Sequence, residues 1–182
     1  SAFEMQARAG VALFTDGEYR RGSYMEALAM SIDGFVEGIS EPIRPRWRGP
    51  NPEAANSAPV NLRVVGERIW KKRRLAGHET EFLRQNAPGP FKVTLPSPTQ
   101  LWIQWFQPGV TDKVYADRGE LLHDIAAIVR DEINSLSDEG PSCVQLDATS
   151  YIDYVDAEGR QKMKELGLDL DEALDQAIEA DN

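Results

Sequence analysis

The stretch FKVTLPSPTQ, residues 91–100, is a short apolar strand followed by two prolines, a serine and a threonine. An apolar run of this length that stops at a proline is typical of a buried strand, here Phe91–Leu95. An amphipathic helix follows in DRGELLHDIAAIVRDEINSLSDEG, residues 117–140, and SCVQLD at 142–147 is a second buried strand. A strand, a helix and a strand in this order predict two parallel strands joined by a right-handed crossover, the unit of an α/β fold.

The predicted helix between the two strands has signals at both ends. Asp117 and Glu120 form an aspartate variant of the capping box at its start, and Gly140 is typical of the chain just after a helix end. Its apolar residues recur on one face: Leu122, Ile125, Val129, Ile133 and Leu136. A last helix is expected to begin near Asp169 and Glu172. Its apolar face would carry Leu170, Leu174 and Ile178.

The first part of the chain is less regular. Val11 to Thr15 is a short apolar run after a glycine, and we expect it to be a third buried strand. A helix and a turn are expected over 24–39, and five prolines make 40–59 a long loop. NLRVVGERIWKKRR, residues 61–74, has the character of one arm of a hairpin, and a short helix is expected from His78 to Gln85. The loop and hairpin form an excursion at about residues 40–76 of a domain that spans 1–182.

Apolar strands that alternate with amphipathic helices place the chain in the α/β class. Three strands can be identified, whereas a closed (β/α)8 barrel, the TIM barrel, has eight. The chain is therefore either a small open sheet or an incomplete portion of a barrel. The open sheet edges of an incomplete barrel would favour association with a complementary barrel fragment or with a second copy.

Composition limits the classes of function. The 182 residues include 20 basic and 30 acidic side chains, a net charge of −10, which argues against binding to the phosphates of a nucleic acid. No apolar run approaches the roughly 18 residues that span a membrane, and the start has no signal-peptide pattern. A single cysteine excludes an internal disulfide framework and favours the reducing cytoplasm.

Polar side chains follow each of the three predicted strands. They are Thr15, Asp16 and Glu18 at the first, Thr94, Ser97 and Thr99 at the second, and Gln145, Asp147, Thr149 and Ser150 at the third. Because ligands bind at the carboxyl ends of parallel strands, we expect one site there, with Glu18 and Asp147 facing the same cleft. Asp147 on its own could equally cap the segment that follows it.

Several chemically distinctive side chains have ordinary structural interpretations. Trp102, with Trp105 and Phe106, is more typical of core or lid packing than of stacking on a planar ligand. Cys143 is expected to be a core thiol inside a strand. The sequence contains no metal-binding spacing, no glycine-rich phosphate loop and no serine elbow.

Three stretches, TDGEYRR at 15–21, KVTLPSP at 92–98 and CVQLDATSY at 143–151, together resemble the catalytic barrel of cobalamin-independent methionine synthase, and most closely its short single-barrel relatives. The resemblance extends over roughly residues 4–182. It implies that the chain is the N-terminal-to-middle portion of a (β/α)8 barrel. It also implies a methyltransferase that moves a methyl group from a folate-type donor to a thiol such as homocysteine, with zinc binding the thiol as thiolate.

The resemblance also implies substrate-binding roles. Glu18 matches the family glutamate that holds the amino-acid substrate, and Asp147 matches the aspartate that binds its amino group. Asp16, Arg20 and Arg21 would complete a charge cluster with these acids. The region where the family places its folate corresponds to three further residues: Ser97, Thr99 and Trp102.

Two departures from the family pattern bear on function. Ala148 occupies the position of a second acid that relatives usually carry, so the substrate could differ from homocysteine or one contact could be lost. The family's zinc ligands, a His-x-Cys pair with a later Glu and Cys, have no counterpart in these residues, and Cys143 lies in the wrong strand. We therefore expect that this chain alone neither binds catalytic zinc nor turns over.

Two other classes of function stay open. A lyase related to uroporphyrinogen decarboxylase would keep the barrel and a carboxylate site without a metal. A non-catalytic binding or assembly subunit would complete its barrel with another chain.

Overall fold

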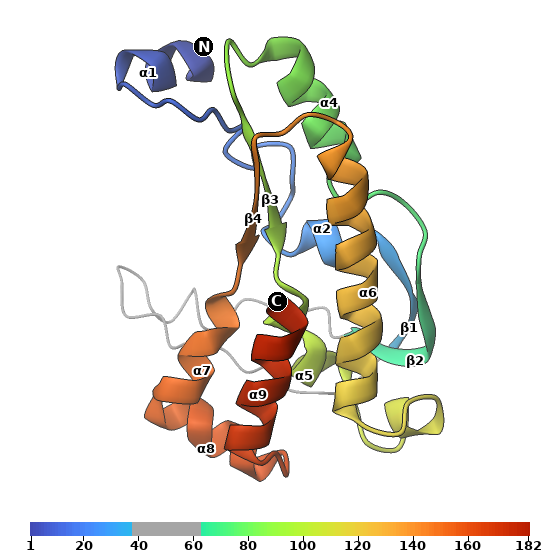
Figure 1. Cartoon of the computed structure of the whole chain (residues 1–182). Helices are drawn as coiled ribbons and strands as arrows, with labels where there is room; N and C mark the ends of the chain where they lie inside the picture. The colour runs from blue at the N-terminus through green and yellow to red at the C-terminus, as the bar shows by residue number, and fades with distance from the viewer. Residues whose placement is uncertain (38–62) are drawn as a thin grey trace.

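The computed structural model describes residues 1–37 and 63–182, and residues 38–62 appear as a grey trace in Figure 1. The proline-rich loop expected at 40–59 lies outside the described residues. The described part has a mixed α/β architecture in which the long helix α6 lies along one side of a parallel pair of strands (Figure 1).

The parallel pair consists of β3 (Lys92–Pro96) and β4 (Cys143–Asp147). The two strands pair in register from Lys92 opposite Cys143 to Pro96 opposite Asp147. The helix α6 (Arg118–Ser137) connects them, so the predicted order of strand, helix and parallel strand is confirmed. The prediction that the second strand is buried was wrong, because every residue of β4 is exposed or only partly buried. Because the register is even, side chains at the same height on the two strands share a face.

The strand expected at Val11–Thr15 is reduced to a single bridge. Phe14 pairs in parallel with Phe91 beside β3, and the Phe14 backbone N–H donates to Pro90 at 2.8 Å. The pairing stops there because the side chain of Gln6 takes both backbone groups of Thr15, at 2.8 and 3.0 Å. The direction was predicted correctly, but the prediction of a full strand was wrong.

A separate hairpin packs beside this unit. It pairs β1 (Ile32–Glu37) antiparallel with β2 (Arg63–Lys71), which confirms that 61–74 supplies one hairpin arm. The helix expected within 24–39 is short, α2 (Glu26–Ala29), and a strand replaces the expected turn. Gly34 hid this strand because its φ of +106° marks a break in the register, a conformation that glycine adopts easily.

The remaining helices are short except the last. They are α1 (Ala2–Arg8), α4 (Gly77–Asn86), α5 (Trp102–Trp105), α7 (Ile152–Val155), α8 (Ala157–Glu165) and α9 (Leu170–Asp181). The predicted helix at 78–85 is confirmed as α4, and α9 begins after Asp169 as predicted. The apolar face predicted for α9 is correct for Leu170 and Leu174, which are partly buried against the core, but wrong for Ile178, which is 45% exposed. Ala173 and Ala177 are buried in its place. Small residues allow α9 to pack closely against its neighbours.

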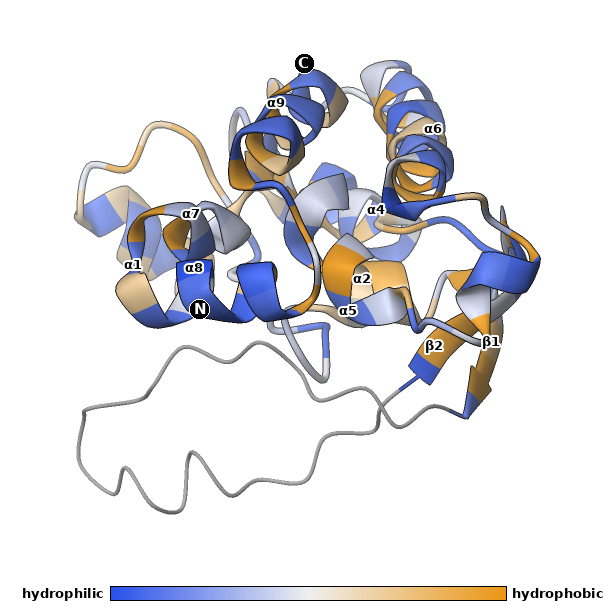
Figure 2. Cartoon of the chain, turned by 90° about the horizontal axis from the view of Figure 1, so that it is seen from below, coloured by the Kyte–Doolittle hydropathy of each residue, from blue (hydrophilic) through white to orange (hydrophobic). Residues whose placement is uncertain are grey.

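The core lies between α6 and one face of β3. Val93 and Leu95 on the strand are buried, as are Ile125 and Val129 on the helix. Figure 2 shows apolar residues of α2 and α6 turned toward the middle of the molecule, with hydrophilic residues on the outer side of α6. Each fully buried aliphatic side chain contributes about 1.5–3 kcal/mol relative to exposure, so this face fixes α6 on the strands.

A buried ion pair also fixes the approach to α4. Glu132 on α6 is fully buried, and both of its carboxylate oxygens accept from Nε of Arg74 at 2.9 Å. Glu132 also accepts the backbone N–H of Ala76 at 3.2 Å, directly before α4 begins. The hairpin, α6 and the start of α4 are therefore held together.

No closed barrel is formed by residues 1–37 and 63–182. The strands in these ranges make two two-stranded sheets and the bridge at Phe14. The edge of β4 away from β3 has no strand partner among them. Within the same ranges, no helix is both long and apolar enough to cross a membrane.

The N-terminal cap of α6 gives the first prediction. The side chain of Asp117 accepts a hydrogen bond from the backbone N–H of Glu120 at 2.9 Å. The Glu120 side chain accepts from the backbone N–H of Ala116, whereas in a capping box it would accept from that of Asp117, one residue later. Asp117→Ala should lower the free energy of unfolding by about 1 kcal/mol, because a helix-end donor loses its partner.

The matched control is Asp138→Ala at the other end of α6. Asp138 is exposed and lies at the C-terminal cap, where a negative charge opposes the helix dipole. Denaturant unfolding should show no loss of stability, or a small gain, for this variant. Equal destabilisation by the two variants would contradict the capping role of Asp117.

Candidate functional site

The site begins at a tight turn after Phe14. Asp16 accepts the backbone N–H of Glu18 at 3.0 Å, and Thr15 accepts that of Gly17 at 3.1 Å. Glu18 has a φ of +59°, and no other non-glycine residue in the described ranges has a positive φ. A left-handed glutamate costs about 1 kcal/mol or more, and such strain is found mainly where a side chain must be presented in a particular direction.

This backbone conformation presents the Glu18 carboxylate beside β3. Its Oε1 accepts from the Thr94 hydroxyl at 2.7 Å and lies 3.2 Å from Nη1 of Arg21. Among the described residues, no hydrogen bond or ion pair is made by its Oε2. The side chain is 26% exposed, and Oε1 is the carboxylate oxygen that the described residues hold.

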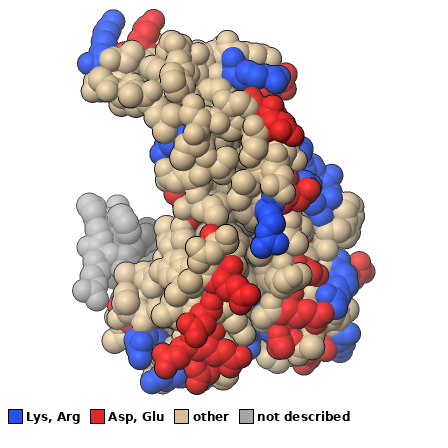
Figure 3. Space-filling view, viewed as in Figure 1, with Lys and Arg blue, Asp and Glu red and all other residues tan. Residues whose placement is uncertain are grey.

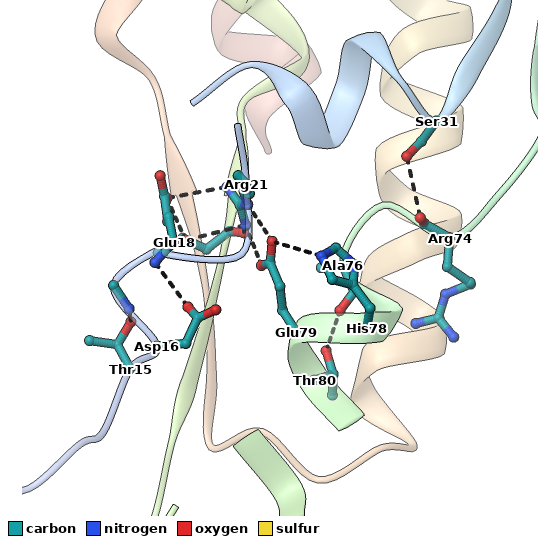
Figure 4. Close-up of polar contacts among 12 residues, drawn as sticks. Thr15, Asp16, Glu18, Arg21, Ser31, Arg74, Ala76, His78, Glu79 and Thr80 are labelled. Carbon is teal, nitrogen blue, oxygen red and sulfur yellow. Dashed lines mark hydrogen bonds and ion pairs between the residues drawn. The ribbon is translucent and has the colours of Figure 1, made fainter. Parts of the chain in front are cut away.

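Arg21 connects this turn to α4 and β3 (Figure 4). Its Nε and Nη2 donate to the two carboxylate oxygens of Glu79 at 2.5 and 2.6 Å, and Nη2 also donates to the carbonyl of Thr94. The Arg21 and Glu79 side chains are each only 2% exposed. Burial opposes the charge of Arg21, but Glu79 and then Glu18 and Asp16 outweigh it, so the pKa of Arg21 is raised.

The second half of the site lies on β4. The carboxylate of Asp147 accepts from the Gln145 amide at 2.5 Å, and the Gln145 carbonyl oxygen accepts from Lys92 at 2.5 Å. Thr94 lies directly opposite Gln145 in the register, so the partners of Glu18 and of Asp147 are neighbours on one face. Side chains alternate along a strand, so this polar face is opposite the apolar face that α6 covers.

Tyr24 lies close to both acids. Its hydroxyl donates to the carbonyl of Asp147 at 2.6 Å. Burial, followed by the charges of Asp147 and Glu18, raises the pKa of Tyr24 to about 12. The two carboxylates therefore act on one phenol, which brings the ends of the Phe14 segment and β4 to a common place.

The other predicted site residues are placed differently. Arg20 is exposed and lies over the ring of Phe82 at 3.5 Å, so Arg21 takes the place in the cluster that both arginines were expected to share. Trp102 is 1% exposed and belongs to the core. Asp16 supports the backbone of Glu18 by accepting its N–H.

The loop after β3 is near the site through its backbone only. The N–H of Ser97 donates to the carbonyl of Asp147 at 3.1 Å, but its buried hydroxyl donates to Asp181 at 2.6 Å. The hydroxyl of Thr99 is bonded to those of Ser97 and Ser150 at 2.6 and 3.0 Å. These hydroxyl groups hold the loop against α9.

Two residues of the site were missed by sequence reasoning. Glu79 lies four positions before Leu83, so both are on the buried side of α4. An acid at a position of a helix where an apolar residue is expected is the sequence pattern that could have indicated a buried ion pair. Tyr24 had no such signal, because its position depends on the left-handed turn before it.

Metal ligands were not expected in this chain, and residues 1–37 and 63–182 contain no group of three or more His, Cys, Asp or Glu that could hold a metal ion. Cys143 is exposed, so its interpretation as a core thiol was wrong. It begins β4 whereas Asp147 ends it, about 13 Å away at the rise of a strand, so its thiol belongs to the other end of the sheet.

The charge on the visible surface is mainly acidic where the last helix lies. The sequence of α9, LDEALDQAIEAD, carries five acidic residues and no basic one. Figure 3 shows acidic side chains gathered over the lower part of that face, with basic side chains in smaller separate groups. This distribution agrees with the net charge of −10 and offers no basic tract to a nucleic acid on this face.

Comparison with known proteins adds the fold relationship. No protein-family profile matches the chain. The uncharacterized protein YxjH of Bacillus subtilis (strain 168) is 28% identical over 167 residues, which are 91% of this chain and 42% of YxjH. The structure of a B12-independent methionine synthase from Shewanella sp. W3-18-1, in complex with selenomethionine, superposes with a TM-score of 0.62 over 97% of this chain and 45% of that one, at 18% identity.

This chain has the fold of part of a B12-independent methionine synthase. It spans less than half the length of either of these proteins, 42% and 45%. At 18% identity this similarity concerns the fold alone. It therefore supports the resemblance to methionine synthase, which the sequence motifs suggested, only as a resemblance in fold.

The raised pKa of Tyr24 predicts a pH dependence of stability. Because the folded pKa is about 12 and an unfolded tyrosine has a pKa of about 10, the stabilisation is fully present below pH 10 and is lost as the pH rises toward 12. Tyr24→Phe should therefore make the free energy of unfolding fall less steeply above pH 10.

Denaturant unfolding at a series of alkaline pH values measures this slope. Burial also raises the pKa of Tyr115 and Tyr151 to about 12, so part of the slope should remain in the variant. Tyr19→Phe is the control for loss of a hydroxyl, because Tyr19 is 91% exposed. An identical slope in wild type and Tyr24→Phe would contradict the burial of Tyr24 between the two acids.

Proposed function

We propose that this site binds the amino-acid end of a thiol substrate, and that the protein is a methyltransferase of the methionine-synthase type. It would move a methyl group from a folate-type donor to a thiol such as homocysteine. The observation that carries the proposal is the pair of carboxylates, Glu18 and Asp147, linked through Thr94, Gln145 and Tyr24 at the ends of adjacent strand segments.

The chemistry of the pair suits an ammonium group. Glu18 keeps one carboxylate oxygen without a partner among the described residues, and hydrogen bonds to ionised groups are the strong ones. The raised pKa of Tyr24 keeps its phenol neutral, so the negative charge of the site is that of the two carboxylates. An α-amino acid would therefore be held by its amino group and oriented by two acids that are themselves fixed.

The comparisons support an amino-acid ligand. The methionine synthase of Shewanella is described in complex with selenomethionine, which is an α-amino acid with a methylated selenium. By its fold, that enzyme suggests only the class of ligand, an α-amino acid, for this protein. The matching residues Glu18 and Asp147 supply the specific part of the proposal.

Zinc would activate the thiol when it is bound, but the described residues of this chain do not fit a zinc site. We propose that the ligands lie in another part of the protein. The contribution of the present residues would be to bind and orient the amino acid and to keep its sulfur directed away from Glu18 and Asp147.

We place the folate-type donor at the loop that follows β3. Ser97 and Thr99 form its hydrogen-bonded base, and the buried Trp102 follows it in the sequence. Because Trp102 is 1% exposed, the loop would have to move before the indole could stack on a planar donor.

A second candidate is a metal-independent lyase or decarboxylase of related fold, and Ala148 favours it. This residue stands directly after Asp147, where an acid would add a further contact to the substrate. A carboxylate site without that acid could accept a different substrate. A non-catalytic binding subunit is the third candidate, and substrate turnover by the intact protein distinguishes it from both enzymes.

The test is the affinity of the intact protein for L-homocysteine and L-methionine, measured by calorimetry. Glu18→Gln and Asp147→Asn should each weaken binding by roughly 2 to 4 kcal/mol, because each leaves a desolvated ammonium without one charged partner. Glu81→Gln is the control, since it makes the same change on the exposed side of α4.

Unchanged affinity in both variants would remove the proposed amino-acid site. Binding of neither amino acid by wild type, together with turnover of another carboxylate substrate, would favour the lyase.

A further inference from the structure

We propose that Glu79 is a positioning residue for the amino-acid site, and that it acts through Arg21 on Glu18. This inference rests on the proposed function, because it assigns a role within the same site. Glu79 itself is too deeply buried to touch a ligand, with a side chain 2% exposed.

The geometry of Arg21 supports the first step. Glu79 accepts two parallel hydrogen bonds, from Nε at 2.5 Å and from Nη2 at 2.6 Å. Such a bidentate pair fixes the plane of the guanidinium as well as its position. A third bond, from Nη2 to the carbonyl of Thr94, ties the same group to β3.

The second step is the contact between Arg21 and Glu18. With Nε and Nη2 directed at Glu79, only Nη1 faces Glu18, at 3.2 Å from Oε1. Nη1 is buried and makes no hydrogen bond of good geometry, so it attracts Glu18 without binding both of its oxygens. The oxygen that Thr94 holds is the oxygen that Arg21 attracts, and Oε2 is left for a ligand.

The charge balance explains why an acid is needed at position 79. Three acids, Asp16, Glu18 and Glu79, act on the single charge of Arg21 and raise its pKa. Since Glu79 neutralises the arginine, Glu18 keeps its own negative charge for an ammonium group. Without the charge of Glu79, the buried guanidinium would turn to Glu18 as its nearest carboxylate and compete with the ligand.

This role separates Glu79 from the neighbouring acid on α4. Glu81 is exposed and accepts from Gln85 at 3.2 Å on the same helix. Glu79→Gln and Glu81→Gln are therefore the same chemical change, two positions apart, with only one of them connected to the site.

A double-mutant cycle in the intact protein tests the inference, with L-methionine as the calorimetric probe. Glu79→Gln should weaken binding about tenfold or more in the wild-type background. In the Glu18→Gln background the same change should have an effect of less than about twofold, because the group through which it acts is gone. Glu81→Gln should have no effect in either background.

A merely structural role for Glu79 would give equal losses of affinity in both backgrounds, and this result would overturn the inference. Circular dichroism and thermal unfolding establish that each variant folds. If Glu79→Gln does not fold, Arg21→Lys replaces it, since it keeps the charge but loses the fork, and the same non-additivity with Glu18→Gln is expected.

Failure of the proposed function would be recognised separately, as absence of L-methionine and L-homocysteine binding by wild type. In that case a crystal structure of the Glu79→Gln variant would test whether Glu79 positions Arg21 and Glu18. Rotation of Arg21 onto both carboxylate oxygens of Glu18 would support it. An Arg21 and a Glu18 that stay where they are in wild type would overturn it.

Discussion

The buried ion pair between Arg21 and Glu79 is the interaction on which the site depends. It joins three parts of the chain, the turn at residues 15–21, the helix α4 and the strand β3, through two side chains that are each 2% exposed. Burying two charges is favourable only when the geometry is good. The bidentate contact with Glu79 and the bond to Thr94 satisfy Nε and Nη2 of Arg21, while the buried Nη1 has only the charge of Glu18 beside it, 3.2 Å from Oε1. The left-handed backbone conformation of Glu18 fits the burial of Arg21. The turn has to direct the Arg21 side chain into the interior while the Glu18 carboxylate stays partly exposed.

Sequence reasoning succeeded where one local pattern determines the structure. The unit of β3, α6 and β4 was predicted because apolar runs, a cap at Asp117 and a glycine after the helix all lie within the segments they define. It failed where a tertiary partner decides. The run at Val11–Thr15 is apolar enough for a strand, yet Gln6 takes the backbone of Thr15. The strand β1 was missed because Gly34 interrupts its pattern, and the small Ala173 and Ala177, rather than the larger Ile178, face the interior from α9.

The site shows the same division between local and tertiary information. The site predicted at the carboxyl ends of the parallel strands stays a prediction, but the structure does bring Glu18 and Asp147 close to one tyrosine, Tyr24. The choice between Arg20 and Arg21 could not be made from adjacent letters, because the direction of each side chain depends on the positive φ of the residues before them. The contribution of Glu79 depends on a partner 58 residues away, which no local pattern reveals.

A crystal structure of the intact protein with L-methionine would show directly whether Glu18 and Asp147 bind an amino acid. We expect the ammonium group to lie about 2.7–3.2 Å from Oε2 of Glu18 and from a carboxylate oxygen of Asp147. We also expect Arg21 to remain paired with Glu79 in that complex. An amino acid bound elsewhere, or one whose carboxylate rather than its ammonium faces Glu18, would contradict the role proposed for the two acids.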